Sequence, residues 1–116
     1  MATKASQNTR HTAESLEQLT ASQPAALIYF FSNNCAPCVS LRPKVSELLN
    51  ENFPEIRLVL VNAEDHRDVA ARYGAFSFPT LIIYFDGREY FRASKYISMS
   101  QLAEKIGKPY QMLFEE

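Results

Sequence analysis

Long hydrophobic segments and an excess of charge are both missing from this chain of 116 residues. The longest apolar run, Ala25 to Phe31, has the length of a strand, whereas a membrane-spanning helix needs about 20 apolar residues. Residues 1–23 hold only scattered apolar positions and no apolar core of a secretory signal, so we expect a cytoplasmic protein without membrane contact. The net charge is -1, with acids and bases interspersed, and predicts no nucleic-acid partner.

Cysteine is scarce as well, since the chain has only Cys35 and Cys38. Two cysteines are too few for a disulfide-stapled scaffold. A bridge between them closes a very small loop and constrains the unfolded chain little. Redox or metal chemistry is therefore a better explanation for the pair than stability.

The periodicity of the apolar residues predicts one domain over residues 1–116, with residues 1–11 loosely held. Helices are expected at 12–20, 38–50, 65–73 and 99–106, and strands at 25–31, 56–61, 81–85 and 88–93. Pro43 lies inside the second helix, and Gly74 is expected to end the third. Gly107 and Pro109 are expected to end the last helix, which leaves 109–116 as a C-terminal extension.

The order of these elements predicts an α/β fold. The β-α-β portion requires a parallel strand pair with a right-handed crossover. Asp86-Gly87 predicts a two-residue hairpin that adds an antiparallel strand. We therefore expect a mixed β-sheet flanked by helices on both faces.

The dithiol falls at the predicted junction between a buried strand and a helix. If Cys35 is the N-cap, its sulfur can accept the backbone N–H of Cys38 beside the positive end of the helix. Both effects favour the thiolate and lower the pKa of Cys35. Cys35 is then the attacking thiolate, Cys38 is the resolving thiol, and Pro37 is tolerated in the first turn.

Other interpretations of the cysteines remain open. Half of a zinc site is one, although His11 and His66 are the only histidines and tetrahedral zinc usually needs four ligands. A cluster or metal shared by the dithiols of two chains is another, and two buried thiols without chemistry are a third. His11 and His66 are each expected to be surface or capping residues. We therefore expect neither a resident metal nor another cofactor.

Several segments together resemble the thioredoxin family over residues 12–106. They are the apolar strand at 27–31, the turn Cys35-Ala36-Pro37-Cys38, Arg72-Tyr73-Gly74 before Phe78-Pro79-Thr80, and the Asp86-Gly87 hairpin. The resemblance implies the three-layer thioredoxin-like fold and a thiol-disulfide oxidoreductase acting on protein substrates. It also implies a cofactor-free reaction, with a reductase or a small thiol as the electron donor.

The resemblance also implies the substrate-binding residues. Pro79 is expected to follow a cis peptide bond and to lie against the dithiol, where the adjacent backbone pairs with an extended substrate peptide. A trans proline that opens an ordinary strand is the alternative. Phe78, Asn34, Ala36 and Pro37 are expected to line the same rim.

The chain departs from the family at informative positions. Asn34 and Ala36 replace the tryptophan and the glycine of the usual Trp-Cys-Gly-Pro-Cys motif. Tyr29 and Leu60 stand where the family has a buried acid and its lysine partner, and Lys95 stands near a usual glycine. Tyr29 is expected to pack in the core, with the alternative that its hydroxyl serves the buried site.

These departures predict a more oxidising disulfide and a narrower range of substrates. Losing the carboxylate and gaining Lys95 both favour the thiolate, which stabilises the reduced form. The polar rim at Asn34 predicts weak general thioredoxin activity. The alternative function is a non-catalytic or redox-sensing binding module. We expect a monomer, while the apolar tail at 110–116 could instead form a dimer contact, fold back or fray.

Overall fold

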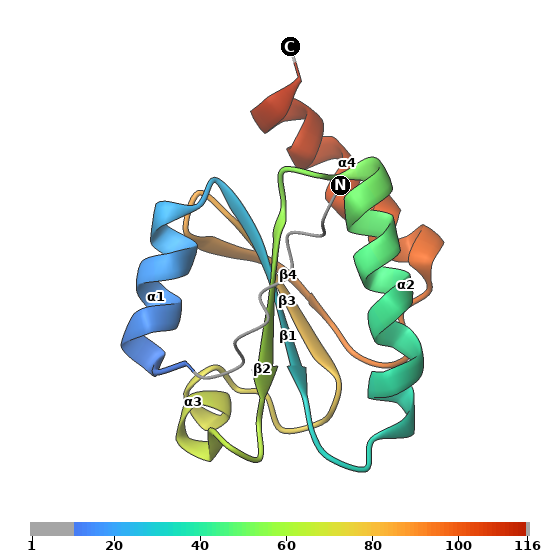
Figure 1. Ribbon diagram of the computed structural model, residues 1–116. Coiled ribbons are helices and arrows are strands. Elements are labelled where there is room, and N and C mark those ends of the chain that lie inside the picture. The colour runs from blue at the N-terminus through green and yellow to red at the C-terminus, as the bar shows by residue number, and fades with distance from the viewer. Residues whose placement is uncertain (1–10, 116) are drawn as a thin grey trace.

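A central β-sheet of four strands separates two layers of helices (Figure 1). The structure is a computed structural model and describes residues 11–115. Along the chain the elements are α1 (Ala13–Ser22), β1 (Ala25–Phe31), α2 (Ala36–Asn52), β2 (Arg57–Asn62), α3 (Arg67–Arg72), β3 (Thr80–Phe85), β4 (Arg88–Ala93) and α4 (Met99–Phe114).

The sheet is mixed, and its strands run in the order β2-β1-β3-β4. β1 pairs in parallel with β2, and β3 pairs antiparallel with both β1 and β4. Helices α1 and α3 cover one face of the sheet, and α2 and α4 cover the other (Figure 1). The predicted α/β fold is therefore confirmed.

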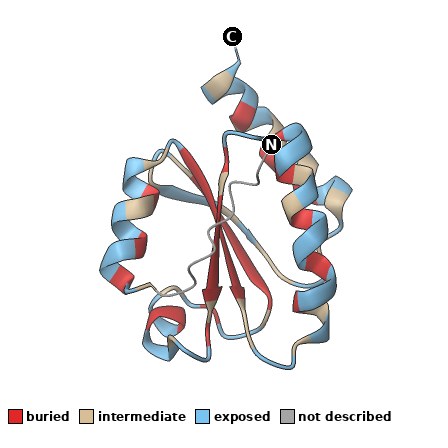
Figure 2. Cartoon of the chain, in the orientation of Figure 1, coloured by how far each residue is buried: buried red, intermediate tan, exposed pale blue. Residues whose placement is uncertain are grey.

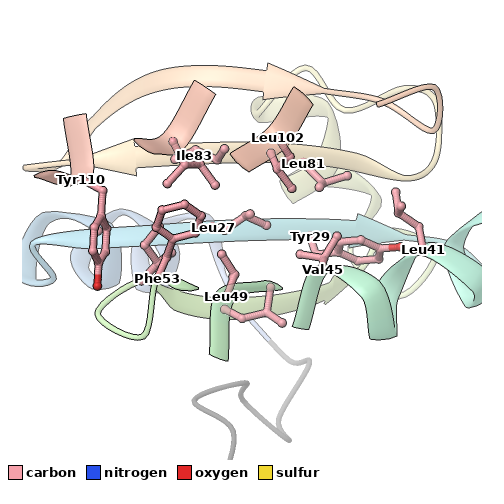
Figure 3. Packing of buried hydrophobic residues seen from close by; sticks show 14 of the residues in the cluster. Leu27, Tyr29, Leu41, Val45, Leu49, Phe53, Leu81, Ile83, Leu102 and Tyr110 are labelled. Carbon is pink, nitrogen blue, oxygen red and sulfur yellow. The ribbon is translucent and has the colours of Figure 1, made fainter. Parts of the chain in front are cut away.

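Side chains of β1 alternate between two hydrophobic clusters. Leu27 and Tyr29 belong to the cluster under α2 and α4 (Figure 3), whereas Ile28 and Phe30 pack with the residues of α1 and α3. The central strands are buried along most of their length (Figure 2). Because both faces are covered, the strand shows an unbroken apolar run instead of alternation.

A tight turn joins β3 to β4. Asp86 has φ 54° and Gly87 has φ 77°. A type I′ turn requires positive φ at both central residues, which Asp-Gly supplies at low cost. This geometry confirms the predicted hairpin.

The last helix is longer than the sequence predicts. Its start is as expected, because Ser98 accepts from the N–H of Gln101 and the Gln101 side chain accepts from the N–H of Ser98. The predicted end at residue 106 is wrong, since α4 passes through Gly107 and Pro109 to Phe114.

Contacts of Tyr110 explain why the helix continues. The Tyr110 ring lies 5.0 Å from that of Phe53 and 4.7 Å from that of Phe114, and its hydroxyl accepts from the N–H of Glu55. These contacts offset the helical hydrogen bond that Pro109 cannot make. The segment expected as an extension from residue 109 is thus helical through Phe114, and Glu116 lies outside the described residues.

Smaller differences concern the other helices. α2 runs from Ala36 to Asn52 and is longer at both ends than the predicted helix at 38–50, although it contains Pro43 as predicted, and α3 is shorter than predicted. Gly74 follows α3 with φ 70°, as expected for a residue that ends a helix. Residues 1–10 of the segment expected to be loose lie outside the described residues. None of the helices in the described range 11–115 has the length and apolarity needed to cross a membrane.

Candidate active site

The dithiol lies where β1 gives way to α2. Asn34 has φ 55°, in the left-handed region that asparagine adopts more readily than most residues. The turn brings Cys35 to the N-cap position of α2. Ala36 and Pro37 fill the first two helical positions, where the missing N–H of proline costs little.

Cys35 and Cys38 are joined by a disulfide, with their Cα atoms 5.2 Å apart. The backbone N–H of Cys38 donates to the sulfur of Cys35 over 3.2 Å. Cys35 is partly exposed, whereas Cys38 is only 3% exposed. The sulfur at the helix N-terminus is therefore the one that a macromolecular substrate can approach.

The environments of the two sulfurs differ in their effect on charge. In the reduced protein, the N–H of Cys38 and the positive end of α2 stabilise a thiolate on Cys35. Burial of Cys38 disfavours the charged form of its own thiol. The arrangement suits an attacking Cys35 and a resolving Cys38.

The segment before β3 lies against the dithiol. The peptide bond between Phe78 and Pro79 is cis, as the resemblance implied. The carbonyl oxygen of Phe78 lies 3.6 Å from the sulfur of Cys35. Phe78 is partly exposed and Pro79 is buried, so Phe78 is the member of this pair that meets solvent beside the disulfide.

Tyr29 takes part in the site from beneath. It is 1% exposed, and it pairs across the parallel β1–β2 ladder with Leu60. Its hydroxyl donates to the backbone oxygen of Cys38 over 2.7 Å. Burial raises the pKa of Tyr29 to about 12, against a smaller opposing effect of the Arg42 charge. Tyr29 thus packs in the core as predicted, and its neutral hydroxyl also contacts the helix of the dithiol.

One open hollow adjoins the disulfide, and a second lies next to Phe78. The first, here called the Arg42 hollow, measures ≈ 710 Å³ and is lined by Phe31, Ser32, Asn33, Asn34, Cys35, Ala36, Cys38, Val39 and Arg42. The second measures ≈ 350 Å³ and is lined by Ser32, Ala63, Glu64, Arg67, Ala70, Ala71, Ala75, Phe76 and Phe78. The Arg42 hollow is the one that both cysteines line, whereas the second hollow shares Ser32 with it and reaches Phe78.

The other residues expected at the rim of the site are exposed or partly exposed. Asn34 and Ala36 are exposed and Pro37 is partly exposed, next to Cys35 in the chain. Lys95 is exposed too, and its ammonium group lies 5.3 Å from the centroid of the Tyr96 ring. The predicted electrostatic effect of Lys95 on Cys35 stays a prediction.

The two histidines contact each other, in a hydrogen bond that does not involve the dithiol. The N–H of His11 donates to Nε2 of His66 over 3.2 Å, and Nδ1 of His66 lies 3.1 Å from the Asn62 carbonyl oxygen. His66 stands at the N-cap of α3 without a side-chain cap bond. Within residues 11–115, no three His, Cys, Asp or Glu side chains are grouped so that they could hold a metal ion.

Some residues of the site were missed from the sequence. Arg42 lines the first hollow, and its guanidinium lies 5.9 Å from the centroid of the Phe31 ring. Asn33 donates to Glu64 and accepts from Asn62, which ties the loop after β1 to the end of β2. Arg42 follows Cys38 by four positions, and this helical spacing would have placed the two side by side.

Comparison with known proteins agrees with this geometry. The family model described as thioredoxin matches residues 7–108. The thioredoxin-like protein YdfQ of Bacillus subtilis is 29% identical over 102 residues, covering 88% of this chain and 90% of that protein. Thioredoxin 1 of Synechococcus elongatus is 32% identical, covering 79% of this chain and 85% of that protein.

Solved structures show the same fold. The X-ray structure of Fasciola hepatica thioredoxin has a TM-score of 0.67 at 30% identity, covering 80% of this chain and 86% of the other. A mutant thioredoxin from Halobacterium salinarum has a TM-score of 0.74 at 19% identity, covering 100% of this chain and 97% of the other. With the family model matching most of its length and the cysteine pair in place at the helix start, the chain belongs to the thioredoxin family of thiol-disulfide oxidoreductases.

Proposed function

We propose that this protein exchanges disulfides with protein substrates through its Cys35-Ala36-Pro37-Cys38 turn. The Cys35 thiolate attacks a substrate disulfide, one substrate sulfur joins Cys35, and the other leaves as a thiolate that takes up a proton. Cys38 then attacks the Cys35 sulfur, forms the intramolecular disulfide and releases the second substrate thiol. The two electrons that reduce the substrate come from the dithiol, and a reductase or a small thiol restores it.

One observation carries this proposal. Cys35 is partly exposed at the N-terminus of α2, and its sulfur accepts the N–H of Cys38. That donor and the helix dipole stabilise an attacking thiolate at an accessible position. Burial of Cys38 directly behind it supports the resolving role.

The substrate backbone is proposed to lie along Phe78 and Pro79. The Phe78 carbonyl next to Cys35 supports this position, because an extended peptide there brings its own sulfur to the reacting atom. Asn34, Ala36 and Pro37 form the opposite rim. Because asparagine at position 34 makes that rim polar, we expect a restricted set of substrates and slow reduction of insulin.

Trapping of mixed disulfides tests the assignment. Cys38→Ser removes the resolving thiol, so substrate proteins should remain attached to Cys35 and be released by dithiothreitol. Cys35→Ser is the matched control and should trap far less. Equal trapping by both variants, or none by Cys38→Ser in an extract from the cytoplasm, where we propose that the protein acts, would refute the roles of the two cysteines.

A further inference from the structure

The buried surroundings of Cys38 offer no acid–base group. Among residues 11–115, the buried polar residues besides the tyrosines are Thr20 and Thr80, and neither side chain ionises at neutral pH. Tyr29 lies against Cys38, but its hydroxyl already donates its proton to the Cys38 carbonyl. A neutral phenol engaged as a donor is not a base at neutral pH. Cys38 must nevertheless lose its proton before it attacks.

Charged groups on the neighbouring elements do not supply that base either. On α2, Arg42 lines the same hollow as Cys38, and it is a cation. After β2 the carboxylate of Glu64 is exposed and accepts from Asn33, and after β4 the Lys95 ammonium lies over Tyr96. The Phe78–Pro79 segment before β3 carries no ionisable side chain.

Solvent water is the remaining proton acceptor, and it can reach Cys38 through the Arg42 hollow. Cys38 lines this hollow together with Val39 and Arg42, although its exposed fraction is small. Val39 is 74% exposed at the mouth. Arg42 lines the same hollow as Cys38, with its guanidinium over the Phe31 ring, and a positive charge in this hollow favours a thiolate on Cys38.

The position of Cys38 is fixed from the opposite side. The hydroxyl of Tyr29, on β1, donates a hydrogen bond of 2.7 Å to the backbone oxygen of Cys38. Tyr29 is only 1% exposed, so this bond is shielded from solvent. A hydrogen bond of this kind holds the first turn of α2 against the sheet while Cys35 carries a bulky substrate. The bond acts on the resolving cysteine and does not involve the sulfur of Cys35.

We propose that Tyr29 is a positioning residue for the resolving step, and that Cys38 gives its proton to water in the Arg42 hollow and not to a side chain. This inference rests on the proposed function. In the step, water or hydroxide takes the Cys38 proton, and the Cys38 thiolate then forms a bond to the Cys35 sulfur. The bond between Cys35 and the substrate breaks, and the substrate leaves as a thiolate that is protonated by solvent.

Reaction of the reduced protein with one equivalent of dithiodipyridine separates the two steps. Attack by Cys35 releases the first pyridine thione, and resolution by Cys38 releases the second. The second phase should accelerate about tenfold per pH unit between about pH 6 and pH 8, because only the thiolate of Cys38 attacks. Cys38→Ser should release one equivalent only.

Tyr29→Phe tests the positioning role. It should slow the second phase by roughly three- to tenfold at each pH, with the same pH slope and an unchanged first phase, as expected for the loss of one buried hydrogen bond. Tyr110→Phe is the matched control. It removes another buried tyrosine hydroxyl, which accepts from the Glu55 N–H away from the dithiol, and should leave both phases unchanged.

The outcomes separate this inference from the proposed function. A missing first phase would overturn the proposed function and the inference with it. A normal first phase followed by a second phase independent of pH would reveal an internal base and overturn the inference alone. A second phase unaffected by Tyr29→Phe, or slowed equally by Tyr110→Phe, would overturn the positioning role.

Discussion

The carbonyl oxygen of Phe78 lies 3.6 Å from the sulfur of Cys35, although the two residues are 43 positions apart in the chain. The N–H of Cys38 faces the same sulfur from α2. In the reduced protein, the N–H and the helix dipole stabilise a thiolate, and the negative end of the Phe78 carbonyl opposes it. Because Cys38 is also buried, which disfavours its thiolate, Cys35 is expected to be the more reactive thiol.

Alkylation of the reduced protein should therefore modify Cys35 first. With iodoacetamide, Cys35 should reach half of its maximal rate below about pH 8.5, where a free cysteine does. Mass spectrometry of the quenched reaction over a range of pH measures this. Cys35→Ser, which leaves only the buried Cys38, should react much more slowly. A midpoint for Cys35 at or above the free-thiol value would show that the helix does not activate it.

The disulfide should be more oxidising than that of thioredoxin. Tyr29 and Leu60 face each other at the positions of the family's buried acid and lysine, so no buried carboxylate opposes the Cys35 thiolate. A more stable thiolate stabilises the reduced form. Equilibration with glutathione buffers should give a potential above the value of about -270 mV for thioredoxin. A value at or below that reference would contradict this reasoning.

The end of α4 should contribute strongly to stability. The Tyr110 ring packs between those of Phe53 and Phe114, and its hydroxyl accepts from the Glu55 N–H. Tyr110→Ala should lower the free energy of unfolding by about 3 kcal/mol, as for other large buried aromatic residues. Urea unfolding with the disulfide intact measures the loss. Met112→Ala, at a side chain that is 80% exposed, is the control and should change it little.

The same helix shows what local sequence signals can and cannot predict. β1 was predicted with its observed bounds because an unbroken apolar run has few other folded solutions. Gly107 and Pro109 gave a correct local signal for a helix end, but Tyr110 contacts Phe53, 57 positions earlier. That tertiary contact outweighs the local preference and is invisible to a reading of neighbouring residues.

The active site divides in the same way. The N-cap geometry of Cys35 follows from residues adjacent in the chain, so it was predictable. The hydrogen bond from Tyr29 to Cys38 depends on how α2 is set against β1, and the sequence left it as one of two alternatives. The Arg42 hollow depends on the loop after β1, which Glu64 fixes through Asn33, and it was not predicted.

Replacing Tyr73 with phenylalanine should stabilise the fold. Its hydroxyl oxygen is buried and has no hydrogen-bond partner, while its ring lies 5.7 Å from that of Phe30. Tyr73→Phe keeps the ring contact and removes an unsatisfied polar group, so the free energy of unfolding should rise by about 1 kcal/mol. Urea unfolding compares this variant with Tyr29→Phe. That variant removes a hydrogen-bonded hydroxyl, so its free energy of unfolding should fall. A loss of stability in Tyr73→Phe would show that the hydroxyl is satisfied in solution.

Buried tyrosines should make the fold sensitive to alkali. Burial raises the pKa of Tyr29 to about 12 and also raises the pKa values of Tyr73 and Tyr84. In the unfolded chain these phenols lose their protons near pH 10. Above that pH the folded state therefore binds more protons than the unfolded state, so stability is complete below about pH 10 and falls as the pH rises toward the folded pKa values. Each such tyrosine contributes a slope of up to about 1.4 kcal/mol per pH unit. Urea unfolding from about pH 8 to pH 11 should show this loss of stability. In Tyr29→Phe, the free energy of unfolding should fall less steeply with pH. A free energy of unfolding that stays constant over this range would mean that the phenols ionise as readily in the folded protein as in the unfolded chain.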